Sequence, residues 1–169
     1  DGIAMGHEGM RSSLASREAI ADTVELTMRG HCYDAIVGLA GCDKSLPGMM
    51  MAMVRLNVPS VFLYGGSILP GRYEGKDVTV QDVFEAVGRH QACVSEAIGL
   101  ALFNSAGAPA PYESRDAYGE ASGQAVMNLL EKNIRARDIV TLKSLENAAR
   151  IVACTGGSTN AGLHLPAIA

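Results

Sequence analysis

The 169-residue sequence has no tryptophan, few aromatic residues and no excess of positive charge. Its 14 lysines and arginines are outnumbered by 18 aspartates and glutamates, and no basic block is present that would bind a nucleic acid backbone. Although 48% of the residues are apolar, no apolar run approaches the roughly 20 residues that a bilayer-spanning helix needs. We therefore expect no nucleic-acid partner and no membrane span.

Cysteine is scarce as well, with four residues scattered along the chain. This pattern indicates a reducing cytoplasm rather than a disulfide framework. Cys32, Cys93 and Cys154 lie in helix-like or strand-like segments, and we expect them to be small buried residues. Cys42 lies instead in a loop-like segment between two apolar segments.

That segment is residues 41–48, Gly-Cys-Asp-Lys-Ser-Leu-Pro-Gly. Residues 35–39 before it are apolar and typical of a buried strand, and residues 59–64 after it predict a second strand. Between them, Ser45 and Pro47 are in place to begin a helix. Strand, loop, helix and strand form a βαβ unit, whose first loop lies where open α/β sheets bind ligands.

The rest of the sequence alternates between helical and extended patterns. Together they predict one domain with a layered α/β fold, in which a mostly parallel sheet is flanked by helices. The predicted segments are a helix at 16–28 with Ser16 as N-cap and Gly30 as stop, a loop at 68–77, a helix at 79–102, a loop at 104–115, a helix at 116–133, a helix at 141–149 capped by Thr141 or Ser144, and a strand at 150–155.

Cys42, Asp43 and Lys44 place a thiol, a carboxylate and an amine in consecutive positions. A thiolate suits iron, whereas a carboxylate suits magnesium or manganese. One cysteine cannot hold an iron–sulfur cluster alone, and Lys44 has the alternative of pairing with Asp43. Asp1, in a glycine-rich segment, could join Asp43 on a hard cation or lie in a solvated turn.

A second glycine-rich segment, Gly156-Gly157-Ser158-Thr159, precedes a helical pattern. Backbone amides at a helix N-terminus can bind an anion, which makes Ser158 and Thr159 candidate substrate-binding residues. The alternative is a tight turn in which one of them caps the helix. The same alternatives hold for Gly65-Gly66-Ser67.

Several ordered blocks of this sequence resemble the dihydroxy-acid dehydratase family. The resemblance implies an internal part of that family's N-terminal α/β domain, within a chain several times longer that continues into a β-rich C-terminal domain. The blocks are Asp1-Gly-Ile-Ala-Met-Gly-His-Glu-Gly-Met10, Ser16-Arg17-Glu18, Cys42-Asp43-Lys44 before Pro47-Gly48-Met49, and Gly156-Gly-Ser-Thr-Asn160 before Leu163-His164-Leu165.

The resemblance implies specific roles for four residues. Cys42 would be one of three ligands of a [2Fe-2S] cluster, while Asp1, Asp43 and a carboxylated Lys44 would bind Mg²⁺. The base that removes the C2 proton would be a serine of the later domain, so no catalytic base is expected in this chain. A homodimeric cytoplasmic enzyme is implied as well.

The implied reaction removes water from 2,3-dihydroxy carboxylic acids to give 2-keto acids in valine and isoleucine biosynthesis. An alternative within the superfamily is a sugar-acid dehydratase, although residues 45–51, Ser-Leu-Pro-Gly-Met-Met-Met, resemble the amino-acid branch. An alternative of another class is a cluster-free α/β module that binds a small anion.

The resemblance also conflicts with a continuous helix over 79–102. Members of that family have a further segment between the parts that correspond to residues 89–91 and 93–97 of this sequence. That segment carries a cysteine that ligates the cluster. We therefore expect that residues are left out of this sequence at about 91–93.

Overall fold

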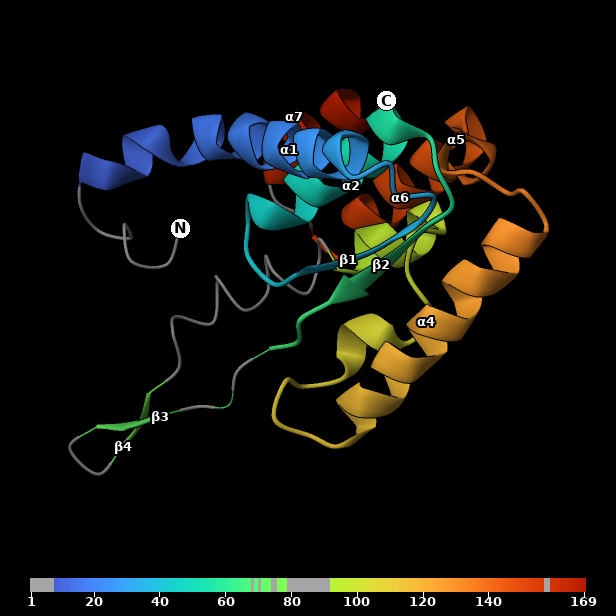
Figure 1. Ribbon diagram of the computed structural model, residues 1–169. Helices are drawn as coiled ribbons and strands as arrows, with labels where there is room; N and C mark the ends of the chain where they lie inside the picture. The colour runs from blue at the N-terminus through green and yellow to red at the C-terminus, as the bar shows by residue number, and fades with distance from the viewer. Residues whose placement is uncertain (1–7, 68, 70, 74–75, 79–91, 157–158) are drawn as a thin grey trace.

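The computed structural model describes residues 8–67, 69, 71–73, 76–78, 92–156 and 159–169 (Figure 1). Its elements alternate between helix and strand along the first part of the chain and are helical from residue 114 onward, which gives a mixed α/β fold. In order, they are η2 (Glu8–Ser12), α1 (Ser13–Gly30), β1 (Ile36–Ala40), α2 (Ser45–Leu56), β2 (Ser60–Tyr64), β3 (Gly71–Tyr73), β4 (Lys76–Val78), a helix at 92–98, η3 (Ser105–Gly107), α4 (Ser114–Glu131), α5 (Ala136–Ile139), α6 (Leu142–Cys154) and α7 (Thr159–Ile168).

The predicted βαβ unit is confirmed. Strands β1 and β2 pair in parallel, from Ile36 opposite Ser60 to Ala40 opposite Tyr64, and α2 connects them. Phe62 of β2 forms a further parallel bridge with Ala101. The carboxyl ends of both strands therefore lie at the same edge of the sheet.

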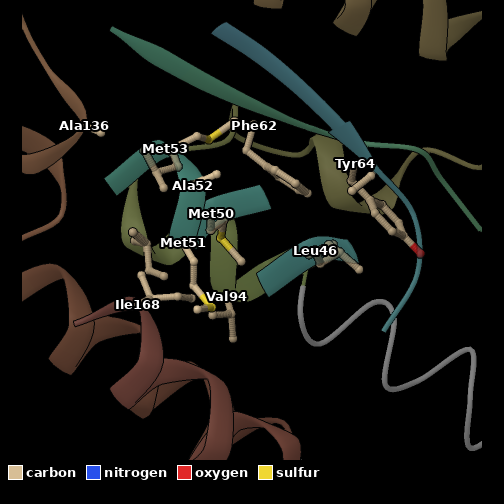
Figure 2. Packing of buried hydrophobic residues seen from close by; sticks show 14 of the residues in the cluster. Leu46, Met50, Met51, Ala52, Met53, Phe62, Tyr64, Val94, Ala136 and Ile168 are labelled. Carbon is tan, nitrogen blue, oxygen red and sulfur yellow. The ribbon is translucent and has the colours of Figure 1, made fainter. Parts of the chain in front are cut away.

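Helix α2 packs against the sheet, and apolar side chains on most of its surface are buried (Figure 2). A Cβ at Gly38 of β1 would lie 2.3 Å from Cε of Met53, so the glycine allows strand and helix to approach closely. The residues labelled in Figure 2 include Leu46, Met50, Met51, Ala52 and Met53 of α2 and Phe62 and Tyr64 of β2. Flexible methionines fill the irregular space between the elements.

Helix α1 lies on the outer side of α2, and α4 contacts the strands from below in Figure 1. A Cβ at Gly48 of α2 would lie 2.8 Å from the carbonyl oxygen of Arg17, so the α1–α2 contact requires a residue without a side chain. Helix α7 also contacts α2. The start of α2, immediately after the β1 loop, is thus enclosed by α1 and α7.

The boundaries of α1 differ from the prediction. The helix begins at Ser13 with Ser12 at the N-cap, and Ser16 lies inside it, where its hydroxyl donates to the carbonyl of Ser13. At the other end the left-handed position is taken by Cys32, with φ 54°, and Tyr33 N–H bonds to Met28 O at 3.1 Å. This is the bonding of a Schellman motif, so the helix ends two residues later than a stop at Gly30 would place it.

The predicted strand at 150–155 is wrong, because α6 continues to Cys154. The predicted cap is correct: Thr141 Oγ1 accepts from Ser144 N–H, and Ser144 Oγ accepts from Thr141 N–H. Buried Ala148 and half-buried Val152 pack on the same side of the helix, so tertiary contact outweighs the β propensity of Ile151 and Val152. The glycines at 156–157 therefore follow a helix and not a strand.

Three further predictions need correction. Residues 71–73 and 76–78 pair as antiparallel strands, β3 with β4, within the segment predicted as a loop. The helix at 92–98 ends before Gly99, which has φ 95°, and does not continue to 102. On α4, Ala121 and Leu130 are exposed, although its helical pattern placed them on the buried side. The part of the predicted helix at 79–91 lies outside the described residues.

None of the four cysteines forms a disulfide, as predicted, but Cys32, Cys93 and Cys154 are less buried than predicted. Cys32 and Cys154 are exposed at helix ends, and Cys93 is half-buried. Burial, followed by the nearby charge of Glu96, raises the pKa of the Cys93 thiol. No helix within the described ranges has the length and apolar character needed to cross a membrane.

Candidate functional site

The loop between β1 and α2 presents Cys42 at the carboxyl edge of the sheet. Cys42 N–H donates to Ser45 Oγ at 3.1 Å, and the Ser45 hydroxyl donates back to the Cys42 carbonyl at 3.0 Å. Leu46 N–H bonds to the same carbonyl, so the loop runs directly into the first turn of α2. These bonds fix the backbone of Cys42 while its side chain stays exposed.

Asp43 and Lys44 lie deeper in the same loop. The ammonium of Lys44, whose side chain is 7% exposed, forms an ion pair with Asp43 Oδ2. The other oxygen of Asp43 accepts a hydrogen bond at 3.3 Å from Nδ2 of Asn160, in the first turn of α7. Two residues 117 positions apart therefore meet at this loop.

Arg17 and His164 connect α7 to α1 beside the loop. Nη1 of Arg17 donates to Leu163 O and to His164 Nδ1, each at 3.1 Å. Burial lowers the pKa of His164 to about 4, and the positive charges of Lys44 and Arg17 contribute to the shift. His164 is therefore neutral at pH 7.

The structure brings together only some of the predicted site residues. Cys42, Asp43 and Lys44 share one loop, as their sequence requires, and Asp43 pairs with Lys44. Asp1 and Ser158 lie outside the described residues, so the predicted meeting of Asp1 with Asp43 stays a prediction. Thr159 is exposed at the start of α7.

Three residues of the site were not predicted to act there: Arg17, Asn160 and His164. Each belongs to a sequence block that carries the family resemblance, which was the available signal. Arg17 is paired with Glu18 at 2.7 Å, its side chain is only 13% exposed, and it also donates to a carbonyl of α7.

The second candidate anion-binding loop, Gly65-Gly66-Ser67, packs closely against the backbone of the segment before α4. Gly66 has φ 93°, and a Cβ there would lie 2.6 Å from Ala110 N and 2.9 Å from Nη2 of Arg115. Ser67 O accepts a hydrogen bond from Ala110 N–H at 2.9 Å. The segment before α4 thus occupies the space an anion would need.

The donor atoms of the β1 loop would fit a metal site only together with ligands from elsewhere. The thiol of Cys42 is exposed, and the carboxylate of the next residue, Asp43, is contacted by Lys44 and by Asn160 of α7. No group of three or more histidine, cysteine, aspartate or glutamate side chains is arranged to hold a metal within the described part of the chain. The loop contains one thiol, a group that soft metals prefer, and one carboxylate, a group that hard cations prefer.

The βαβ unit places this loop beyond the carboxyl end of β1, which is where open α/β sheets bind ligands. The chain belongs to the dihydroxy-acid/6-phosphogluconate dehydratase family, because that family's N-terminal model matches residues 1–92 and 90–169. The family prediction made from the sequence is confirmed.

Curated relatives match the whole chain and carry the name dihydroxy-acid dehydratase. The protein from Dinoroseobacter shibae is 78% identical, that from Parvibaculum lavamentivorans 70%, and that from Sulfurisphaera tokodaii 47%. The chain spans 35%, 35% and 36% of their lengths, respectively. The Dinoroseobacter alignment covers 201 residues against the 169 of this chain, so 32 aligned positions have no counterpart here.

Proposed function

We propose that the full-length protein containing this chain dehydrates 2,3-dihydroxy-3-methylbutanoate and 2,3-dihydroxy-3-methylpentanoate to the corresponding 2-keto acids. The observation that carries the proposal is the loop Cys42-Asp43-Lys44 at the carboxyl end of β1, in a chain 78% identical to a relative named dihydroxy-acid dehydratase. As a homodimeric enzyme of valine and isoleucine biosynthesis it would act in the cytoplasm.

The proposed cofactors are a [2Fe-2S] cluster and Mg²⁺. Cys42 would be one ligand of the cluster, while Asp43, Asp1 and Lys44 as a carbamate would bind the magnesium. When bound, these groups supply Lewis acids for the departing 3-hydroxyl and for the charge that develops at C1 and C2.

The residues of this chain would bind and orient these groups. The bonded turn at Cys42–Ser45 holds the thiol at the surface of the loop, and the amide of Asn160 holds the carboxylate of Asp43. The base, a serine, and the other cluster cysteines would come from parts of the protein outside this chain. Ser158 and Thr159 remain candidates for contact with the substrate carboxylate through the start of α7.

The 32 unmatched alignment positions support the proposal that a segment is left out at about residues 91–93, because the family match also divides into two parts at residues 90–92. If the protein lacks that segment, it should retain little activity, since the segment is expected to carry a cluster ligand. Sequencing the coding region across this junction tests the proposal: an uninterrupted codon order Gln91-Ala92-Cys93 would contradict it.

The function is tested on anaerobically purified full-length protein. We expect two iron atoms and two acid-labile sulfides per chain, as the formula [2Fe-2S] requires, and turnover of dihydroxymethylbutanoate in preference to gluconate, xylonate and arabinonate. Preference for one of the sugar acids would identify the superfamily alternative. Active protein that is free of iron would contradict the cluster.

A matched pair of serine substitutions assigns the thiol. Cys42→Ser should lower both the iron content and the activity, the latter by at least ~100-fold, since a metal ligand matters more than the outer contacts that cost about 10–100-fold. Cys154→Ser, at another exposed thiol, should change neither. Equal iron content in the two variants would exclude Cys42 as a ligand.

A further inference from the structure

The carboxylate of Asp43 is held at both of its oxygens by residues from different parts of the chain. Lys44, its neighbour in the loop, contacts Oδ2, and Asn160 of α7 donates to Oδ1 at 3.3 Å. The bond from Asn160 restricts the rotation of the carboxylate, which lowers the entropy lost when a cation binds. Unlike the ion pair with the ammonium of Lys44, this bond does not depend on the protonated form of the lysine.

We propose that Asn160 is a positioning residue, whose amide sets the orientation in which Asp43 meets a divalent cation, and that Arg17 and His164 hold α7 where Asn160 can do so. The proposal rests on the proposed function, because it takes Asp43 as a cation ligand.

The placement of α7 depends on two adjacent contacts. Arg17 donates to the carbonyl of Leu163 and to the ring of His164, which fixes both the position and the rotation of that helix against α1. Arg17 is itself held by Glu18, and the second oxygen of Glu18 accepts from Arg55 of α2 at 3.0 Å. Helices α1, α2 and α7 are therefore connected by one chain of charged contacts behind the loop.

The protonation of His164 suits a site for cations. A guanidinium can only donate, so Nδ1 of His164 accepts and its proton resides on Nε2. Nε2 is buried, with no hydrogen-bond partner among the described residues. A neutral ring adds no positive charge near Lys44, where a charged one would repel a divalent cation.

The test measures cation binding without turnover, by titrating full-length protein with Mn²⁺ and following the free ion by electron paramagnetic resonance. Asn160→Leu keeps the approximate size of the side chain and removes its donor. We expect it to weaken Mn²⁺ binding about 10-fold or more, the lower end of the range for contacts that orient metal ligands. The matched control is Asn147→Leu at an exposed position of α6, which should bind Mn²⁺ as the wild type does.

Two further variants complete the test. Asn160→Ser introduces a smaller polar side chain too short for the 3.3 Å contact, and it should show the same weakening if Asn160→Leu does not fold. Arg17→Lys cannot make the paired contacts to α7, and we expect a smaller effect, about threefold. Circular dichroism establishes that each variant is folded.

The outcomes separate this proposal from the function. Folded Asn160 variants that bind Mn²⁺ as tightly as the wild type would overturn the positioning role and leave the dehydratase proposal intact. A wild type that dehydrates its substrate but binds no Mn²⁺ would overturn the role of Asp43 and, with it, that of Asn160. A wild type that binds Mn²⁺ but dehydrates no dihydroxy acid would contradict the function alone, and a weakened Asn160→Leu would still support positioning.

Discussion

Strands β1 and β2 are both followed by glycines, Gly41 and Gly65-Gly66, and the two exits contact each other through a 2.8 Å bond from Gly65 N–H to Ala40 O. After Gly41 come an exposed thiol and a carboxylate that α7 reaches with an amide. After Gly65 the backbone of another segment packs directly on Gly66.

The comparison shows that a glycine-rich strand exit has no single role. At the first exit, the glycine precedes the thiol of Cys42 and the carboxylate of Asp43, and α7 contacts that carboxylate. In the second exit, the glycine itself is required, because no side chain fits between the strand and Ala110. Substitutions should therefore affect binding at the first exit and stability at the second.

The largest expected effect on stability is at the second exit. Gly66→Ala places a Cβ against backbone atoms at 2.6 and 2.7 Å, at a φ that side chains rarely adopt, and we expect it to cost about 2–4 kcal/mol of unfolding free energy. Gly65→Ala is the control, since its Cβ would meet Gly41 Cα at 3.4 Å. Urea unfolding of the two full-length variants measures the difference, and equal midpoints would show that close packing does not require a glycine at position 66.

A smaller effect is expected at His164 of α7, beside the first exit. Because of this residue, the stability of the protein should depend on pH. The folded state keeps His164 neutral down to about pH 4, whereas the unfolded chain protonates it near 6.5. Stability contributed by the neutral ring is therefore lost as pH falls from about 6.5 to 4, at roughly 1.4 kcal/mol per pH unit.

Comparison of wild type with His164→Gln tests this directly. Between pH 6.5 and 5 the wild type should lose roughly 2 kcal/mol more than the variant, measured by urea unfolding at each pH. His31→Gln, at an exposed histidine after α1, should behave as the wild type does. Parallel curves for the wild type and His164→Gln would show that this histidine does not protonate on unfolding.

The smallest expected effect is at Gly41. A Cβ there would have only an ordinary contact, 3.7 Å from Gly65 Cα, so Gly41→Ala should change the unfolding free energy by less than about 1 kcal/mol. The same variant leaves Cys42 and Asp43 in place, and its Mn²⁺ binding should be within a factor of about three of the wild type. A large loss of stability would mean that close packing requires a glycine at both exits, which would remove the contrast between them.

The part of the fold that sequence predicted well is the part whose signals are local. The apolar run before Gly41, the helix-starting residues Ser45 and Pro47 and the run at 60–64 gave the βαβ unit correctly. The cap of α6 was also predicted, because Thr141 and Ser144 bond within four residues. The end of α6 was not, because Ile151 and Val152 favour a strand unless their packing is known.

The candidate site divides in the same way. Cys42, Asp43 and Lys44 were found because they are adjacent in sequence and differ in chemistry. The contacts of Asn160 with Asp43 and of Arg17 with His164 join residues 117 and 147 positions apart, and no local pattern encodes such pairs. The hairpin β3–β4 was missed because strands of three residues are too short for alternation to be visible.

The span of the Asn160–Asp43 bond also determines the order in which this region can form during synthesis. The βαβ unit is complete once residue 64 has left the ribosome, whereas α7 begins at Thr159, at least roughly 95 residues later, which is at least several seconds at ordinary translation rates. In that interval the nascent chain contains Cys42 and Asp43 without the helix that holds the carboxylate. If the loop binds a metal as proposed, loading in the final arrangement would follow translation of α7.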